Sequence, residues 1–300
     1  MPNYLDKNLR GGDRSEYLAQ YILSALGVAV QVPRPEDHGF DYFCSLQREE
    51  GRRLTFHSPF SVQLGSVDGS VSHKEFAYGG LTDHKDPEKR QHKDWEIEFL
   101  RKQRLPFFVG TADKTQHRLR LYSTGPMWYV LHRNTKIGEI ILCPEDTRNL
   151  DTESKDGEIL TPEGLSLPRL RIPLGLPVID LSIMDLLTDK VDKAAKALEY
   201  AIRMEQQNLV YRDLDVQYFL RLDGHTPNEE GATYQYSFVP DRGVVEKTPN
   251  WLRPIMIMLA LAYKRENNDL ALEKLRGMLT LLPLSDVDKT ILRKHAGLTF

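Results

Sequence analysis

The order of the hydrophobic patterns in residues 1–125 is the feature that most limits what this chain can fold into. Leu18, Ile22 and Leu26 recur at helical spacing, and Gly27 follows them as a helix stop. Three short strand patterns come next, and after them a second helical pattern and two further strand patterns. This order is typical of an α/β protein, so we predict a mixed central sheet flanked by helices.

Turn residues and prolines set the limits of these elements. We predict helices over residues 15–26 and 92–104, strands within 28–32, 40–46, 54–64, 106–110 and 119–122, and a polar turn over 47–53. The strand at 106–110 is apolar along its whole length, which predicts that both of its faces are buried.

The rest of the chain changes character twice. We therefore divide the chain into an α/β core over residues 1–145, an extended connecting segment over 146–190 and a mainly helical C-terminal region over 191–300. Pro168, Pro173 and Pro177 disfavour a helix in the connecting segment, and its acidic start, residues 146–157, predicts a loop. In the last region we expect helices over 191–209, 251–265 and 270–282, a strand over 233–239, and Asn268 in the turn and N-cap of the final hairpin.

The charge, the cysteines and the apolar runs exclude several classes of protein. A net charge of −3 gives no global basic signature, so a nucleic-acid surface has to be a local patch. Two cysteines, Cys44 and Cys143, cannot form a disulfide scaffold, which is typical of a reducing compartment and predicts a cytoplasmic protein. No apolar run approaches the ~20 residues of a membrane span, so we expect no association with a membrane.

Basic residues gather around the helix predicted at residues 92–104. This cluster suggests a patch for the phosphate backbone of a nucleic acid. Acidic residues are interspersed with the basic ones, so a solvated face with balanced charges is the competing interpretation. Cys44, between Tyr42 and Leu46 in an apolar strand, indicates packing in the core rather than a nucleophile.

Three polar residues stand out in the predicted core. Glu16 lies in what we expect to be the first turns of the opening helix, Asp41 begins an apolar strand, and Gln63 ends the next one. Polar groups on core strands cost free energy unless they are bound. Oxygen ligands on adjacent strand ends are what a magnesium site uses, so the pattern favours a metal site.

Each residue also has a simpler explanation. Glu16 is the kind of residue that the helix dipole favours in a first turn. Asp41 fits a turn together with Gly39, and Gln63 fits a hydrogen bond to a neighbouring backbone group.

The order of these residues over positions 10–125 resembles the PD-(D/E)XK, or restriction-endonuclease-like, nuclease superfamily. The similar branch is prokaryotic and defence-associated, with a glutamate on the first helix, a Gly-Phe-Asp strand and a Gln-Val-Lys strand. Here the matching residues are Glu16, the sequence Gly39-Phe40-Asp41, and Gln63. The resemblance implies a restriction-endonuclease-like core in which Asp41, Gln63 and Glu16 hold Mg²⁺ or Mn²⁺.

The fourth position of the motif departs from the family. The family's lysine, two residues after the Gln63 position, orients the attacking water, but this chain has Gly65 there. Losing such a group from a preorganised site costs ~10²–10³ in rate. The glycine is compatible with a natural loss of activity, with a deliberate inactivating substitution, or with a lysine supplied from elsewhere, for which Lys74 is the nearest downstream candidate.

The resemblance implies a metal-dependent DNA endonuclease of a bacterial anti-phage or restriction system, with a catalytic set of Glu16, Asp41, Gln63 and position 65. Because Gly65 replaces the lysine, we expect impaired catalysis and weak metal binding, and whether the chain is an enzyme stays open. The alternative is a non-catalytic pseudonuclease that binds nucleic acid or a partner protein. DNA is favoured over RNA as the nucleic acid.

The final helical hairpin is similar to one tetratricopeptide-type unit. Such arrays need about three repeats for stability, and the sequence holds one. A simple helical cap is therefore the favoured interpretation, with a protein-binding role for the C-terminal region as the alternative.

Overall fold

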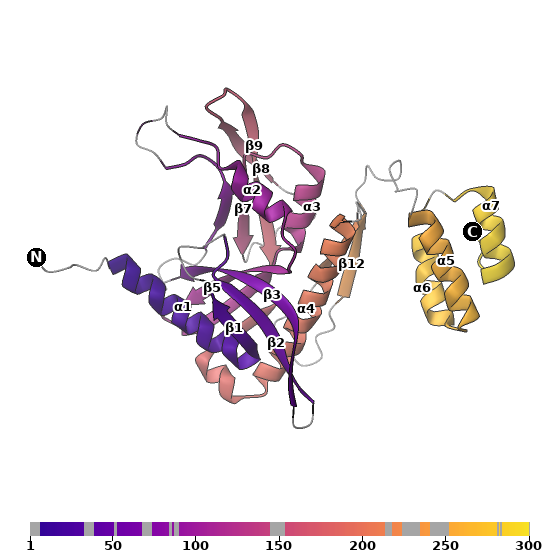
Figure 1. The fold of residues 1–300 in the computed structure, drawn as a ribbon, viewed down its shortest axis with the longest axis horizontal. Helices are drawn as coiled ribbons and strands as arrows, with labels where there is room; N and C mark the ends of the chain where they lie inside the picture. Colours follow the sequence, from indigo (N-terminus) through magenta and orange to yellow (C-terminus); the bar gives the residue numbers. More distant parts are fainter. Residues whose placement is uncertain are drawn as a thin grey trace, which may run out of the picture. The chain divides into compact units, whose positions relative to one another are not determined.

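The structure is a computed structural model, and it divides the chain into two compact units, which we describe separately (Figure 1). The first unit comprises Met1–Val210 and Phe219–Val239, and the second comprises Tyr211–Tyr218 and Pro240–Phe300. The structure describes residues 7–32, 39–50, 53–67, 74–83, 86, 90–144, 154–213, 218–223, 235–240, 252–280, 282 and 284–299.

The first unit is built on a six-stranded mixed sheet in the order β1-β2-β3-β5-β6-β10. Its strands are β1 (Gly27–Gln31), β2 (Tyr42–Glu50), β3 (Arg53–Val67), β5 (Phe107–Asp113), β6 (Arg118–Ser123) and β10 (Ile179–Ser182). All neighbours are antiparallel except β3 and β5, which are parallel. A parallel pair needs a long crossover, and this one includes strand β4 (Phe76–Gly79) and helix α2 (Asp94–Arg101). The prediction of an α/β fold with a mixed sheet is confirmed.

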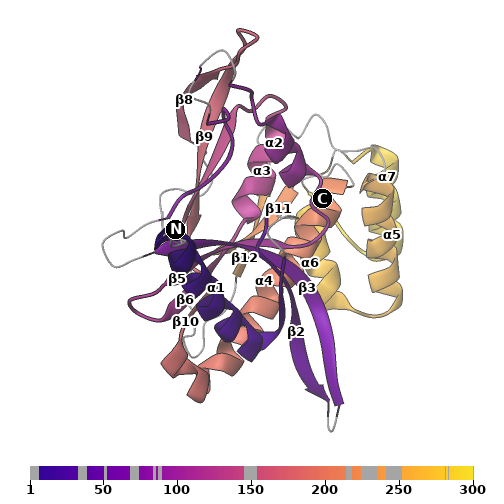
Figure 2. The same cartoon turned by 60° about the vertical axis from the view of Figure 1, so that its left-hand side comes forward.

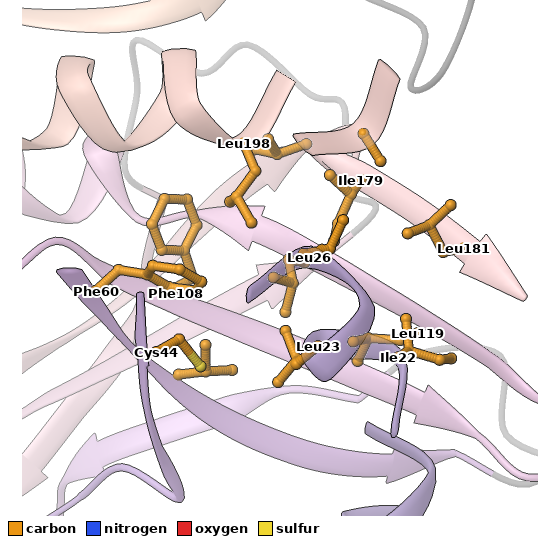
Figure 3. Close-up of a cluster of buried hydrophobic side chains, with 14 of the residues drawn as sticks. Ile22, Leu23, Leu26, Cys44, Phe60, Phe108, Leu119, Ile179, Leu181 and Leu198 are labelled. Atoms are coloured by element: carbon orange, nitrogen blue, oxygen red, sulfur yellow. The ribbon is translucent and has the colours of Figure 1, made fainter. Parts of the chain in front are cut away.

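One face of this sheet is covered by α1 (Lys7–Leu26) and α4 (Lys190–Asp213). From α1, Ile22 and Leu26 enter a cluster with Cys44, Phe60 and other strand residues, several of which are labelled in Figure 3. From α4, three alanines enter the same cluster together with Leu198 and Ile202. Burying a leucine or isoleucine contributes roughly 1.5–3 kcal/mol, so this cluster is a main source of stability.

A second sheet has the order β4-β7-β9-β8. Its strands are β4 (Phe76–Gly79), β7 (Glu139–Pro144), β9 (Ser166–Gly175) and β8 (Ser154–Leu160). Together with α2 and α3 (Gly125–Arg133), it covers the opposite face of the first sheet. On β5, Phe107 and Val109 enter this second cluster while Phe108 enters the first, so the predicted burial of both faces is confirmed.

The segment predicted as an extended connection contributes strands to both sheets. Strands β8 and β9 belong to the second sheet, and β10 completes the edge of the first. Its predicted extended character over residues 167–181 is confirmed, whereas residues 154–157 of the predicted loop belong to β8. The rest of that loop, residues 146–153, lies outside the described residues. A short 3-10 helix, Ile183–Leu187, then leads to α4.

Two predicted limits are wrong. The first helix begins at Lys7 rather than Ser15, because the sequence before Ser15 also takes up helical structure. The polar turn predicted over residues 47–53 is mostly strand, because β2 continues to Glu50 and β3 begins at Arg53. A hairpin ladder is held by backbone hydrogen bonds, which polar side chains do not prevent. Figure 2 shows this hairpin projecting beyond the other strands of the sheet.

The second unit consists of α5 (Leu252–Arg265), α6 (Asp269–Leu279), α7 (Asp286–Ile291) and a π-helical turn, Leu292–Ala296. Asn268 caps α6 by accepting a hydrogen bond from the Ala271 N–H at 3.1 Å, as predicted. Strands β11 (Tyr218–Asp223) and β12 (Gln235–Pro240) form a separate two-stranded sheet, most of which belongs to the first unit. Among the described helices, none is long and apolar enough to cross a membrane.

Candidate functional site

Glu16 lies in the middle of α1, nine residues after the helix begins at Lys7. The dipole of a helix acts within its first turn, so it does not explain a glutamate here. The Gln31 side chain, at the end of β1, donates a hydrogen bond from Nε2 to Glu16 Oε2 at 2.6 Å. The Tyr42 hydroxyl donates to the Glu16 carbonyl oxygen at 2.8 Å. These contacts hold Glu16 at the end of β1 and the start of β2.

Asp41 directly precedes β2 and extends its pairing with β3. Its N–H donates to the carbonyl oxygen of Val62 at 2.8 Å, and its Oδ2 accepts from the Leu64 N–H at 2.6 Å. The Asp41 carboxylate therefore accepts the hydrogen bond from the Leu64 N–H that a backbone carbonyl would accept if β2 began earlier in the chain. Gly39 has a φ of +94°, so the predicted turn character of this segment is present beside the strand start.

The buried phenol of Tyr42 lies close to both carboxylates. Burial raises its pKa, and the negative charges of Glu16 and Asp41 raise it further. All three effects disfavour a phenolate. Glu16 and Asp41 therefore both lie within electrostatic range of the Tyr42 hydroxyl.

Gln63 lies on the face of β3 that is turned away from α1. Tyr42 pairs with Val62, so the antiparallel register places Asp41 opposite Gln63. The Oε1 atom of Gln63 is buried, and among the described residues it has no hydrogen-bond donor. An unsatisfied buried acceptor costs about 1–3 kcal/mol. The alternative in which Gln63 binds a neighbouring backbone group is therefore not supported for this oxygen.

Gly65 leaves room for the side chain of Lys74. A Cβ atom added at Gly65 would lie 2.4 Å from Lys74 Cγ, 3.2 Å from Lys74 Cε and 3.0 Å from Phe76 Cζ. The alkyl chain of Lys74 thus crosses the space that a side chain at position 65 would fill. Lys74 Cε carries the ammonium group, so the cation is held close to position 65. Sequence spacing alone could name Lys74 as a candidate but could not place it.

A hydrogen bond between Ser15 Oγ and Ser66 Oγ, 2.8 Å long, joins α1 to the end of β3. Asp41 and Gln63 lie opposite one another at one end of the first sheet, whereas Glu16 belongs to α1, which covers the other face of that sheet from Gln63. Within the described parts of the chain, no group of three or more His, Cys, Asp and Glu residues could hold a metal. The buried Gln63 oxygen that lacks a hydrogen-bond donor among the described residues is chemically suited to a hard cation.

Among the described residues, most members of the basic cluster are paired within the protein, whereas Lys85 and Lys89 lie outside the described residues. Lys93 forms an ion pair with Glu96 at 2.9 Å, and Arg118 forms one with Asp180 at 2.8 Å. Such contacts favour the balanced, solvated face over a phosphate patch. Cys44 is buried in the core, and burial raises its pKa to about 12, so it is not a nucleophile.

Sequence reasoning missed a fully buried carboxylate at Glu205 on α4. Trp128 donates from Nε1 to Glu205 Oε2 at 2.9 Å, and the Ser123 hydroxyl donates to Oε1. Burial raises its pKa to about 7, against the opposing effect of hydrogen bonds that include the Gly125 N–H. The missed signal was its spacing: Glu205 follows Leu198 and Ile202 on the apolar stripe of the helix. Its contacts with α3 and β6 make it a structural group.

We compared the chain with family models, with curated proteins and with solved structures, and none of them matches. A fold alone supports many functions.

Proposed function

We propose that this chain is a metal-dependent nuclease that hydrolyses phosphodiester bonds in DNA, with Lys74 as the cation missing from position 65. The observation that carries the proposal is the path of the Lys74 side chain over Gly65. In the similar nuclease family, a lysine at that position acts on the same side of the sheet as the residue two before it. Lys74 supplies a cation to the corresponding space from another segment.

The order of the elements supports the same proposal. Helix α1 is followed by three antiparallel strands, and β5 returns parallel to β3 after α2. This order resembles the core of restriction-endonuclease-like proteins, in which the metal-binding residues lie on the second and third strands. Asp41 at the start of β2 and Gln63 near the end of β3 match that arrangement.

Each residue has a defined part in the proposed chemistry. Asp41, Gln63 and Glu16 would hold Mg²⁺ or Mn²⁺, which when bound supplies positive charge to neutralise a phosphate and to acidify a water. Hydrolysis forms a bond from the water oxygen to phosphorus and breaks the bond from phosphorus to the leaving oxygen, and a proton released by the water passes through solvent to the leaving oxygen. The Lys74 ammonium would orient the water and stabilise the negative charge that develops on the phosphate oxygens.

A nicking assay on plasmid DNA tests the proposal. The unmodified chain should nick DNA with Mg²⁺, and Lys74→Ala should lower the rate by ~10²–10³-fold. Lys102→Ala is the matched control, because Lys102 caps the C-terminus of α2, its side chain is exposed, and its ion pair with Glu98 is 3.9 Å long. The same loss in both variants, or no loss in Lys74→Ala, would reject the role of Lys74.

The non-catalytic module is the second candidate. It is favoured by the hydrogen bonds that Glu16 and Asp41 already accept within the protein, from Gln31 and Leu64. Carboxylates that accept hydrogen bonds within the protein can serve only to stabilise the fold. This candidate would be supported if the chain binds DNA but does not nick it with either Mg²⁺ or Mn²⁺. A role in defence would then be one that needs no cleavage.

A further inference from the structure

A cavity of about 380 Å³ opens beside Gln63 and Lys74. Its walls include four aromatic side chains, Phe76 and Tyr78 from β4 and Trp95 and Phe99 from α2. Polar side chains, among them Gln63, Lys74, Glu75 and Glu96, share the lining with the aromatic ones. Volumes of 300–1,000 Å³ are typical of sites for small molecules or parts of larger ones. The cavity is therefore large enough for one aromatic ring system next to the proposed site.

The aromatic wall continues out of the cavity along the sheet. Phe40 stacks on Phe99 with ring centroids 5.9 Å apart, and it meets Phe43 edge-on at 4.6 Å. The two outer members are open to solvent, with Phe43 43% exposed and Trp95 58% exposed. Large exposed aromatic surfaces in line with a cavity are a feature of binding sites rather than of a bare surface.

Gly39 packs closely against this aromatic wall because it has no side chain. A Cβ at this residue would lie 2.7 Å from Cε1 of Phe99, and its φ of +94° is one that other residues rarely adopt. The backbone at Gly39 therefore contacts the Phe99 ring directly. Glycine at the start of the Gly-Phe-Asp segment thus serves the cavity wall as well as the turn.

The charges around the cavity are compatible with an anionic ligand. Glu75 is paired with Arg171, and Glu96 is paired with Lys93. The acidic groups of the wall are thereby balanced within the protein. No carboxylate among the described residues forms an ion pair with Lys74, so its ammonium group remains available to a phosphate.

We propose that this cavity binds an unpaired nucleobase, so that the preferred substrate is a single-stranded polynucleotide. Every base has a flat aromatic face, and stacking on exposed aromatic side chains tolerates any sequence. A base held between Trp95 and the wall would bring its flanking phosphate towards Lys74. The inference rests on the proposed function, since it names the form of the nucleic acid that the same site takes.

Fluorescence anisotropy with a labelled single-stranded DNA oligonucleotide in EDTA tests the inference without any catalysis. Trp95→Ala should raise Kd by ~5–100-fold, the range that stacking of one base provides. Phe56→Ala is the matched control, because Phe56 is 57% exposed and lies on β3 away from the cavity lining. It should change Kd less than about twofold, within the usual range for surface substitutions. Trp95→Phe should keep most of the affinity.

Equal Kd values for Trp95→Ala and the unmodified chain would overturn the inference, as would tighter binding of a blunt duplex of the same sequence. Circular dichroism of each variant excludes unfolding as the cause of a loss. The outcomes also separate this inference from the proposed function. If binding of DNA depends on Trp95 but no cleavage occurs, the base-binding cavity is supported and the nuclease activity is rejected. If cleavage occurs and neither it nor binding changes in Trp95→Ala, the nuclease activity is supported and the base-binding cavity is rejected.

Discussion

At the scale of single residues, Gly65 and Lys74 have to be considered together. In the proposed nuclease site, Gly65 stands where a lysine is expected, and in the structure the side chain of Lys74 occupies the space beside it. Any larger residue at 65 would displace the Lys74 side chain. The two positions therefore share one volume, and a change at either of them acts on the other.

This sharing predicts a specific pattern of activity. Gly65→Ala should lower the rate of DNA nicking by ~10–10²-fold, because a shift of about 1 Å in a positioned group is costly to catalysis. Gly65→Lys alone should be crowded by Lys74, whereas Gly65→Lys combined with Lys74→Ala should recover activity from the family's usual position. Nicking rates at saturating Mg²⁺ measure both effects. Full activity of Gly65→Ala would show that Lys74 has no part in catalysis.

Asp41 is the residue on which metal binding depends in the proposed site. Asp41→Asn should weaken the binding of Mg²⁺ or Mn²⁺ at least about tenfold, because it removes the charge but keeps an oxygen for the Leu64 N–H. Titration calorimetry measures this, with Asp286→Asn, fully exposed on α7, as the control. Equal heats for Asp41→Asn and the unmodified chain would remove the metal site.

At the scale of elements, Glu205 joins three parts of the first unit. It lies on α4, accepts a hydrogen bond from Trp128 on α3, and accepts another from Ser123 on β6. A buried carboxylate is costly when it is charged, and hydrogen bonds offset only part of that cost. The junction is therefore more stable with Glu205 protonated.

The stability of the first unit should consequently decrease as the pH rises. The pKa of Glu205 rises from 4.5 to about 7 in the folded protein, so the folded state binds the proton more tightly. The stabilisation is present in full below about pH 4.5 and is lost as the pH rises through about 7. Glu205→Gln should remove this loss, so its Tm should change less between about pH 5 and 8 than the Tm of the unmodified chain.

Glu199→Gln is the control for this experiment. Glu199 lies on the same helix, where it pairs with Arg203 at the surface. Its substitution should leave the slope of Tm against pH unchanged. Identical slopes for Glu205→Gln and the unmodified chain would mean that Glu205 does not titrate in this range.

At the scale of the whole molecule, the core of the first unit unites residues from distant parts of the chain. Ile22 and Phe60 pack in the same cluster as Leu181, Leu198 and Ile202. The α4 helix covers a sheet of which five strands lie within residues 27–123, and it follows the last of these five by almost 70 residues. A core of this kind has no complete hydrophobic face without its last helix.

Shortening the chain should show this dependence. A chain ending at residue 189 should lack a cooperative thermal transition, because the removal of α4 exposes the first cluster to water. A chain ending at residue 240 keeps α4 and should unfold cooperatively. Thermal melts followed by circular dichroism distinguish the two. A cooperative transition in the shorter chain would show that residues 1–189 form a self-sufficient domain.

The sequence by itself determined the α/β order, the strand buried on both faces, which it placed at residues 106–110, the extended proline-rich segment and the cap at Asn268. These features depend on local periodicity and on backbone preferences, which neighbouring residues carry. The sequence also singled out Glu16, Asp41 and Gln63, since polar residues on apolar elements are visible without a structure.

The tertiary structure alone decided which residues share a space. It placed Lys74 over Gly65, set Glu205 against Ser123 and Trp128, and lined one cavity from β3, β4 and α2. It also showed that the polar sequence at 47–53 is mostly strand. Such contacts join residues that are far apart in the chain, and their free energy depends on packing and burial that no local pattern records.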